Sequence, residues 1–219
     1  MDILKVPPDT TGLHVAAVPC RQPRLIVSFL PAMFTIRLST ASFAVLAAAL
    51  QAGCVSYYRV PSDAPYASVR LTTDTDDRTT FNVLDPDACP KPYPRVLAGM
   101  GKQLAAMGRE TGLDMAGSSV EPPARTRERK VLPGKRMYIA AISYAAPPAE
   151  DMRCAAGVSF IPQAGGQYEI RYTRDETAAH CAARVLQLQP QADGGAVLVQ
   201  ESTQQGFRAL RAEYLCESR

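Results

Sequence analysis

The stretch GVSFIPQAGGQYEIRY, residues 157–172, decides the fold. Apolar and polar residues alternate on both sides of its centre, which is typical of β-strands that bury one face. Between the two halves lie Pro162 and the glycine pair Gly165-Gly166, residue types that favour a tight turn. We therefore predict two antiparallel strands joined in a β-hairpin.

Short strand patterns occur on either side of this stretch. They lie at residues 68–71, 80–83, 135–144, 184–188 and 196–199, the last two flanking a turn at residues 193–195. Six or seven short strands with turns between them predict a mainly all-β domain. We expect an antiparallel β-sandwich or an open barrel with one or two short helices.

Three segments interrupt the strand pattern. Residues 96–107 have the spacing of one short helix, although Gly99 and Gly101 each cost about 1 kcal/mol in a helix. Residues 117–130 are rich in proline and arginine and are predicted to be a loop. Residues 207–215 are predicted to form a short terminal helix or a last strand.

An export signal is predicted near the start of the chain. Residues 33–53 combine a short positive segment, an apolar run at residues 38–50 and small residues, within the length of about 15 to 30 residues of a signal peptide. We expect translation to start at Met33 and residues 1–32 to be a mis-assigned upstream extension. The apolar run is too short for a spanning helix, which needs roughly 20 apolar residues. Cleavage within residues 47–49 would release a soluble periplasmic protein.

The sequence Ala52-Gly53-Cys54 resembles the lipobox of signal peptidase II, with Leu50 four residues before the cysteine. The resemblance implies that Cys54 is lipidated by fatty-acyl chains of the palmitate type, which anchor the protein in a membrane. In sorted lipoproteins an aspartate after the cysteine retains the protein at the inner membrane, whereas Val55 follows here. The resemblance therefore implies the periplasmic face of the outer membrane. Residues 54–65 would be the lipid anchor and tether, and residues 66–219 the periplasmic domain.

Export changes how the cysteines are interpreted. Cys20 lies in the extension and Cys54 carries lipid, which leaves four cysteines in an oxidising compartment: Cys89, Cys154, Cys181 and Cys216. Two disulfides are expected, with three possible connectivities. If consecutive strands run up, down and up, Cys154 and Cys181 lie at the same end and meet where the strands face each other. Cys89 would then pair with Cys216.

The order of several motifs adds a resemblance over residues 79–185. It comprises Asp85 to Cys89, Pro133 to Lys135, Cys154, Ser159-Phe160-x-Pro162, Gly166-x-Tyr168 and Cys181. In this order the chain resembles small, uncharacterised proteobacterial envelope lipoproteins. The resemblance implies an all-β periplasmic domain and brings no activity.

The search for chemistry is mostly negative. His180 is a lone histidine beside Cys181, which is more typical of a loop or surface residue than of a general base. Residues 74–77, DTDD, lack the glycine and distal glutamate of a calcium loop, so a solvated turn is favoured. Residues 125–130 contain four basic residues that would meet an anionic surface, although acidic neighbours favour a solvated loop. We expect no catalytic residues, metal or cofactor. A net charge of +3 argues against a nucleic-acid partner.

These patterns favour a non-enzymatic lipoprotein with a structural or protein-interaction role in the cell envelope. Its partners would be the membrane, through the N-terminal lipid, and an envelope protein that pairs with a sheet edge. The alternative is an envelope enzyme or enzyme inhibitor that acts on peptidoglycan or a protease. It requires a concave pocket with converging polar groups.

Overall fold

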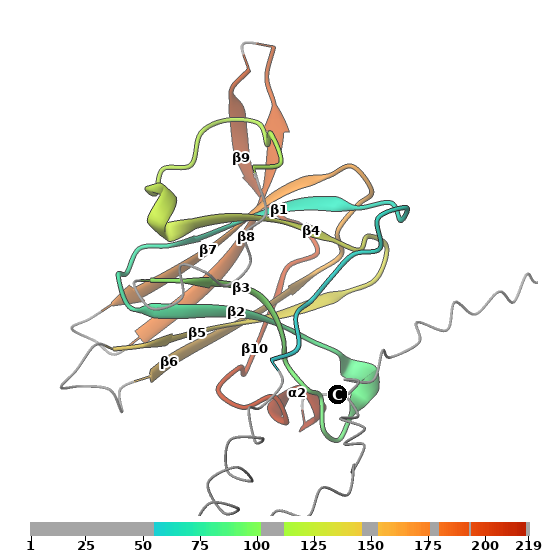
Figure 1. The fold of residues 1–219 in the computed structure, drawn as a ribbon, viewed down its shortest axis with the longest axis vertical. Coiled ribbons are helices and arrows are strands. Elements are labelled where there is room, and N and C mark those ends of the chain that lie inside the picture. The colour runs from blue at the N-terminus through green and yellow to red at the C-terminus, as the bar shows by residue number, and fades with distance from the viewer. Residues whose placement is uncertain (1–54, 102–111, 146–152, 176–179, 193, 218–219) are drawn as a thin grey trace, which may run out of the picture. The chain divides into compact units, whose positions relative to one another are not determined.

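A computed structural model describes residues 55–101, 112–145, 153–175, 180–192 and 194–217. The chain divides into two units, Met1–Cys54 and Val55–Arg219. The upstream extension, the signal peptide and the lipid attachment at Cys54 lie outside the described residues. In the second unit the strands form two five-stranded sheets that pack face to face (Figure 1), so the prediction of an all-β sandwich is confirmed.

The first sheet has the strand order β4-β1-β7-β8-β9. Its strands are β1 (Ala67–Thr73), β4 (Thr126–Val131), β7 (Gln167–Asp175), β8 (His180–Pro190) and β9 (Ala196–Gln200). Neighbouring strands are antiparallel except β1 and β7, which run parallel. The sheet is therefore mixed, and not purely antiparallel as the sequence predicts.

The second sheet has the order β10-β6-β5-β2-β3, and its pairs are all antiparallel. Its strands are β2 (Arg78–Leu84), β3 (Arg95–Met100), β5 (Met137–Tyr144), β6 (Arg153–Phe160) and β10 (Gln205–Phe207). Three short helices complete the described part: η1 (Pro86–Ala88), η2 (Pro123–Arg125) and α2 (Tyr214–Glu217).

The hairpin predicted for residues 157–172 is wrong, because its two strands lie in opposite sheets. β6 pairs with β5 and β10, while β7 pairs with β1 and β8, so neither strand has an edge left for the other. The turn between them crosses from sheet to sheet. In this turn Gly165 has a positive φ of 72° and donates its N–H to Tyr66 O at 2.9 Å. The Tyr168 hydroxyl accepts the N–H of Gln163 at 2.9 Å.

Two further predictions are corrected. The predicted helix at 96–107 is a strand as far as Met100, because Leu97, Ala98 and Met100 are buried and the segment pairs with β2. Residues 102–107 lie outside the described residues. The predicted loop at 117–130 becomes strand β4 from Thr126 onward. By contrast, the antiparallel pair β8 and β9 around the predicted turn at 193–195 is present. The segment 207–215 contains the end of β10 and the start of α2.

The core lies between the inner faces of the two sheets. Its largest fully buried side chains are Tyr168, Tyr172, Phe81, Phe160, Leu71, Met100, Ile139 and Ile170. The rings of Phe81 and Tyr172 meet edge to face across the sandwich, with centroids 6.4 Å apart, which favours aromatic contact. A second cluster forms outside the β2–β5 sheet, where Ala209 and Leu215 of the C-terminal segment cover Leu84 and Ala140.

Two disulfides lie among the described residues, with the pairing expected from the sequence. Cys154 of β6 is bonded to Cys181 of β8, which joins the two sheets with Cα atoms 6.0 Å apart. Cys89, directly after η1, is bonded to Cys216 of α2 with a Cα separation of 5.7 Å. The second bridge fastens the C-terminal segment to the sheet that it covers.

The first described residues are attached to the sandwich. Tyr57 forms a parallel bridge with Val96 of β3, and Tyr58 packs against the core. The Tyr58 hydroxyl accepts the N–H of Leu132 at 3.1 Å, and burial raises the pKa of this hydroxyl. The segment 54–65, expected to be an extended spacer, is therefore bound to the domain at Tyr57 and Tyr58.

Candidate functional site

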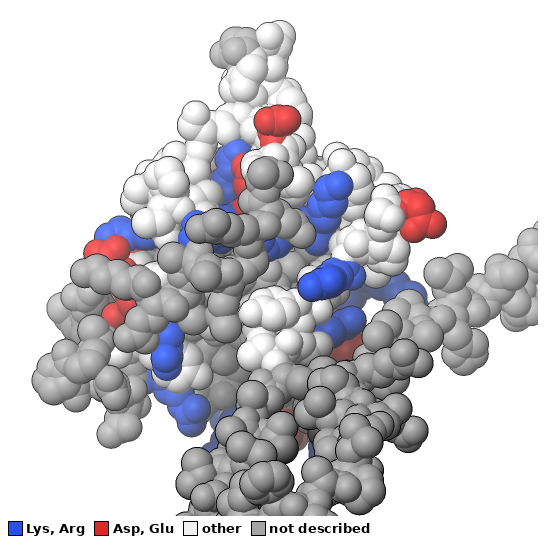
Figure 2. Space-filling view, viewed as in Figure 1, with Lys and Arg blue, Asp and Glu red and all other residues white. Residues whose placement is uncertain are grey.

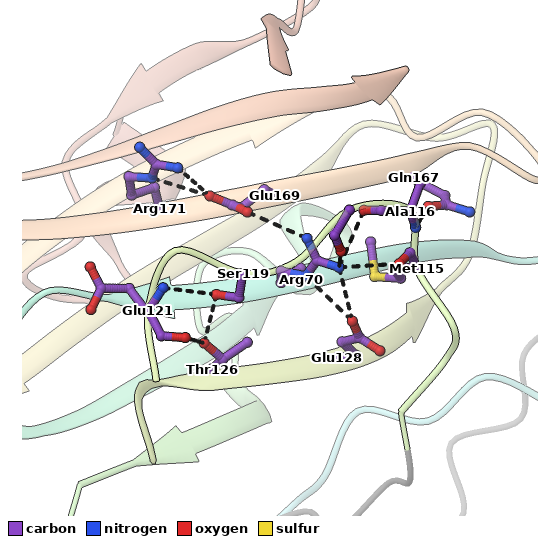
Figure 3. Close-up of polar contacts among 11 residues, drawn as sticks. Arg70, Met115, Ala116, Ser119, Glu121, Thr126, Glu128, Gln167, Glu169 and Arg171 are labelled. Carbon is purple, nitrogen blue, oxygen red and sulfur yellow. Dashed lines mark hydrogen bonds and ion pairs between the residues drawn. The ribbon is translucent and has the colours of Figure 1, made fainter. Parts of the chain in front are cut away.

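A row of charged side chains crosses the outer face of the first sheet (Figure 3). Arg70 of β1 lies opposite Glu128 of β4 on one side and opposite Glu169 of β7 on the other. Their strand neighbours, such as Val69 and Ile170, point into the core, so the charged side chains point outward. Strand pairing thus brings together three residues that are far apart in the sequence.

Arg70 is buried, with 3% of its surface exposed, and Glu169 is exposed by 2%. The Arg70 Nε and Nη2 atoms both lie 3.3 Å from Glu128 Oε1, and Nη1 lies 3.8 Å from Glu169 Oε2. Nη2 also donates to the carbonyl oxygen of Gly117 at 2.8 Å. A buried cation is tolerated when it is paired and hydrogen-bonded in this way.

Both carboxylates have further partners. Glu169 Oε1 accepts from Arg171 Nη2 at 2.6 Å, and Glu128 Oε2 accepts the N–H of Leu113 at 2.6 Å. Two cations and two anions therefore balance within the group. We call Arg70, Glu128 and Glu169 the loop clasp, because Arg70 and Glu128 bind the backbone of the loop at residues 112–121 to the sheet and Glu169 pairs with Arg70.

The clasped loop also contacts β7 and the turn of the β8–β9 hairpin. Ala116 donates its N–H to Gln167 Oε1 at 2.7 Å, and Gly117 donates its N–H to Gly194 O at 3.4 Å. Because Gly117 O is bound by Arg70, the clasp is linked to the turn of the hairpin through a single residue, Gly117. The loop therefore contacts the turn that leads into β9.

An open hollow of about 740 Å³ lies beside this loop, and its lining includes Asp114, Ser119, Glu121, Thr126 and Arg127. The hydroxyls of Ser119 and Thr126 lie 2.9 Å apart and hydrogen-bond each other, and Ser119 Oγ accepts the N–H of Glu121 (Figure 3). The described lining residues include no histidine or cysteine. Ser119, Glu121 and Thr126 are therefore engaged with one another.

The sequence candidates for chemistry lie elsewhere. His180 is exposed at the start of β8, where it lies opposite Asp175. In the acidic turn at 74–77, Asp74 Oδ1 accepts the N–H of Arg174 at 3.0 Å, and Asp77 pairs with the Arg174 guanidinium. Across the described residues, no group of three or more potential metal ligands is present.

The basic residues at 125–130 engage separate partners. Arg125 Nε donates to Asp76 Oδ1 at 2.8 Å, and this hydrogen bond raises the pKa of Arg125. Arg129 is buried and donates to Leu97 O at 2.9 Å, joining β4 to β3, while Lys130 lies 4.1 Å from the Tyr66 ring centroid. On the face shown in Figure 2, the basic side chains (blue) and acidic side chains (red) of the described residues are interspersed.

Strand β9 is a candidate that the sequence did not indicate. It lies at one edge of its sheet, and the β8–β9 hairpin projects from the sandwich (Figure 1). Val197 is 42% exposed and Leu198 39% exposed, and the strand AVLVQ contains no charge and no proline. Natural proteins usually protect the edges of their sheets with charged residues or proline. In the described part of the chain, β9 pairs with β8 alone.

Among the described helices, none is long and apolar enough to cross a membrane. Comparisons with known proteins give no match: no family model matches the chain, and no curated protein or solved structure does either. Function must therefore be argued from the sequence and from the geometry described above.

Proposed function

We propose that this protein is a non-enzymatic lipoprotein of the bacterial envelope whose sandwich binds a partner protein through the edge of strand β9. Lipid on Cys54 anchors it to the periplasmic face of the outer membrane. The observation that carries the binding role is the exposed, uncharged edge strand. The partner is an extended apolar segment of another envelope protein.

The cysteines support export. Cys89, Cys216, Cys154 and Cys181 are used in two disulfides, and such bonds persist in oxidising compartments. Cys54 belongs to neither of these two bridges.

The geometry of β9 supports strand addition. An edge strand presents backbone N–H and C=O groups that an incoming segment can pair with, while alternate side chains supply specificity. The partner side chains would meet the exposed Val197 and Leu198. The hydrogen bond between Gly117 and Gly194 holds the turn of the hairpin, which reduces the ordering that binding would require.

Anchoring is tested by metabolic labelling of the full chain with an alkyne fatty acid. We expect the wild-type chain to be labelled and the Cys54→Ala variant to lose the label. A wild-type chain that stays unlabelled in its native host would overturn the anchor.

Binding is tested in cells with a photo-crosslinking amino acid at position 197 and, as a matched control, at Val120, which is 70% exposed in the loop. We expect one discrete crosslinked protein from position 197 and none from position 120. A Leu198→Lys substitution should abolish the crosslink, because it places a charge on the edge. Equal crosslinking from the two positions, or crosslinking to a second copy of this chain, would refute the proposed partner.

A further inference from the structure

The described chain reaches the sandwich within two residues of the proposed anchor. Ser56 O accepts the N–H of Val96 at 2.8 Å, and Tyr58 donates its N–H to Val96 O at 2.9 Å. Because an extended chain spans at most about 3.6 Å per residue, Cys54 lies within about 7 Å of Ser56. Lipid on Cys54 would therefore bring this end of the domain to the surface of the bilayer.

The register identifies the residues at that end. Tyr57 pairs with Val96 in parallel, so the chain before Tyr57 runs back alongside Pro94 and toward Tyr93. Tyr93 is 76% exposed, Val55 49% and Tyr57 39%. Tyr93 stands between Pro92, which is buried, and Pro94, so the backbone on both sides of its ring is restricted.

We propose that Val55, Tyr57, Tyr93 and the exposed Lys91, which we call the anchor face, lie against the lipid headgroups beside Cys54. The contact rests on the lipidation put forward under the proposed function. Tyrosine suits this position because its ring is apolar and its hydroxyl is polar, the combination found at membrane–water interfaces. An ammonium group such as that of Lys91 suits anionic headgroups.

The charges around the anchor face are mixed. The exposed Glu213 lines a shallow hollow of about 280 Å³ with Lys91 and Tyr93, and a second exposed carboxylate, Asp87, precedes Lys91 closely in the sequence. Because acidic side chains offset the charge of Lys91, the aromatic rings and the short chain to the anchor carry the contact. Electrostatic attraction adds little.

The orientation that follows agrees with the proposed binding edge. The anchor face lies at the end of the sandwich where η1 and α2 are found, and the β8–β9 hairpin projects from the other end (Figure 1). With the anchor face on lipid, the edge strand points away from the membrane. A partner could then reach β9 without contacting the bilayer.

The absence of tryptophan from the chain gives a direct test. A Tyr93→Trp variant carries one emitting residue on the anchor face. The matched control is Tyr144→Trp, because Tyr144 lies at the far end of the β2–β5 pair from the anchor face. Tyr144 is opposite Arg78 at that far end, whereas Leu84, at the η1 end of β2, is opposite Tyr138. At about 3.4 Å per residue the two ends of this strand pair are roughly 20 Å apart.

Both variants are made as full chains, purified from the membrane fraction of the native host and reconstituted in phosphatidylcholine–phosphatidylglycerol vesicles with brominated acyl chains. We expect the Tyr93→Trp emission to shift to the blue and to be quenched relative to unbrominated vesicles, and the Tyr144→Trp emission to be unchanged. The mass of the N-terminal peptide is measured on the same samples.

The two proposals fail in distinguishable ways. A lipidated N-terminal peptide with no quenching of the Tyr93→Trp emission overturns the anchor face and leaves the anchor standing. Equal quenching of the two variants also overturns the anchor face, because it would mean that no particular end of the domain meets lipid. An N-terminal peptide without lipid overturns the anchor itself and the anchor face with it.

Discussion

Replacing Arg70 with methionine tests whether the loop clasp holds residues 112–121. The substitution keeps much of the side-chain volume but removes the cation from two carboxylates, one of which, Glu169, is 2% exposed. Removing one partner of a buried ion pair costs about 3 to 5 kcal/mol, because a buried charge is left uncompensated. Arg171 still binds Glu169 Oε1, so we expect the lower end, about 3 kcal/mol of the free energy of unfolding.

The free energy is measured by urea unfolding followed by circular dichroism, with both disulfides intact. Arg125→Met is the matched control, because it removes an arginine whose partner Asp76 is 75% exposed. Exposed ion pairs contribute little, so this variant should unfold nearly as the wild type does. Equal stability of the two variants would refute the reasoning about the clasp.

Hydrogen exchange supplies a second measurement on the loop. The amides of Leu113 and Ala116 donate to Glu128 and Gln167, so they should exchange slowly in the wild type. Arg70→Met should speed their exchange before the rest of the sheet opens. Unchanged exchange in the loop would mean that residues 112–121 are held by contacts other than the clasp.

The remaining predictions concern the bridges and the core. Replacing Cys89 and Cys216 with serine should cost about 5 kcal/mol of stability, against about 3.5 kcal/mol for Cys154 and Cys181, because the closed loops differ, with separations of 127 and 27 residues. Urea unfolding of the two double variants checks the order, and the reverse order would contradict the chain-entropy account. Burial raises the pKa of the Tyr172 hydroxyl above its ordinary value of 10.0. The un-ionised hydroxyl therefore contributes fully to the free energy of unfolding below pH 10.0, and this contribution is lost as the pH rises above that value. Tyr172→Phe should lose less stability than the wild type over that alkaline range in pH-dependent urea titrations; an equal loss would show that other groups dominate.

Local patterns in the sequence predict most strands and do not predict their partners. The alternation in residues 157–172 is the same whether the two strands pair with each other or with others. They separate because β1, β5, β8 and β10 occupy their edges. The helix predicted at residues 96–107 is wrong for a related reason. An apolar run with glycines becomes a strand here only through its pairing with β2. The pairing of Cys154 with Cys181 is predictable because consecutive strands alternate in direction. The starts of β6 and β8 then lie at the same end, whether or not β6 pairs with β7.

The candidate sites were harder to predict than the fold. Arg70, Glu128 and Glu169 are ordinary polar positions in alternating strands, and nothing local distinguishes them from solvated residues. Their burial depends on residues 112–121 lying over them, which is a long-range contact. Likewise the run of apolar residues in β9 predicts a strand, but whether that strand is central or at an edge is decided by the whole sheet.

The parallel pairing of β1 with β7 has a consequence for when the domain can fold. β1 ends at Thr73, yet its neighbour begins at Gln167, so the first strand has no β7 beside it until much later residues have emerged. Long-range pairings of this kind slow folding and leave early strands exposed meanwhile. A chain delivered N-terminus first, from a ribosome or a translocation channel, would therefore leave the β7 side of β1 unpaired until residues 167–175 have been delivered, and holdase chaperones would find that side accessible during the interval.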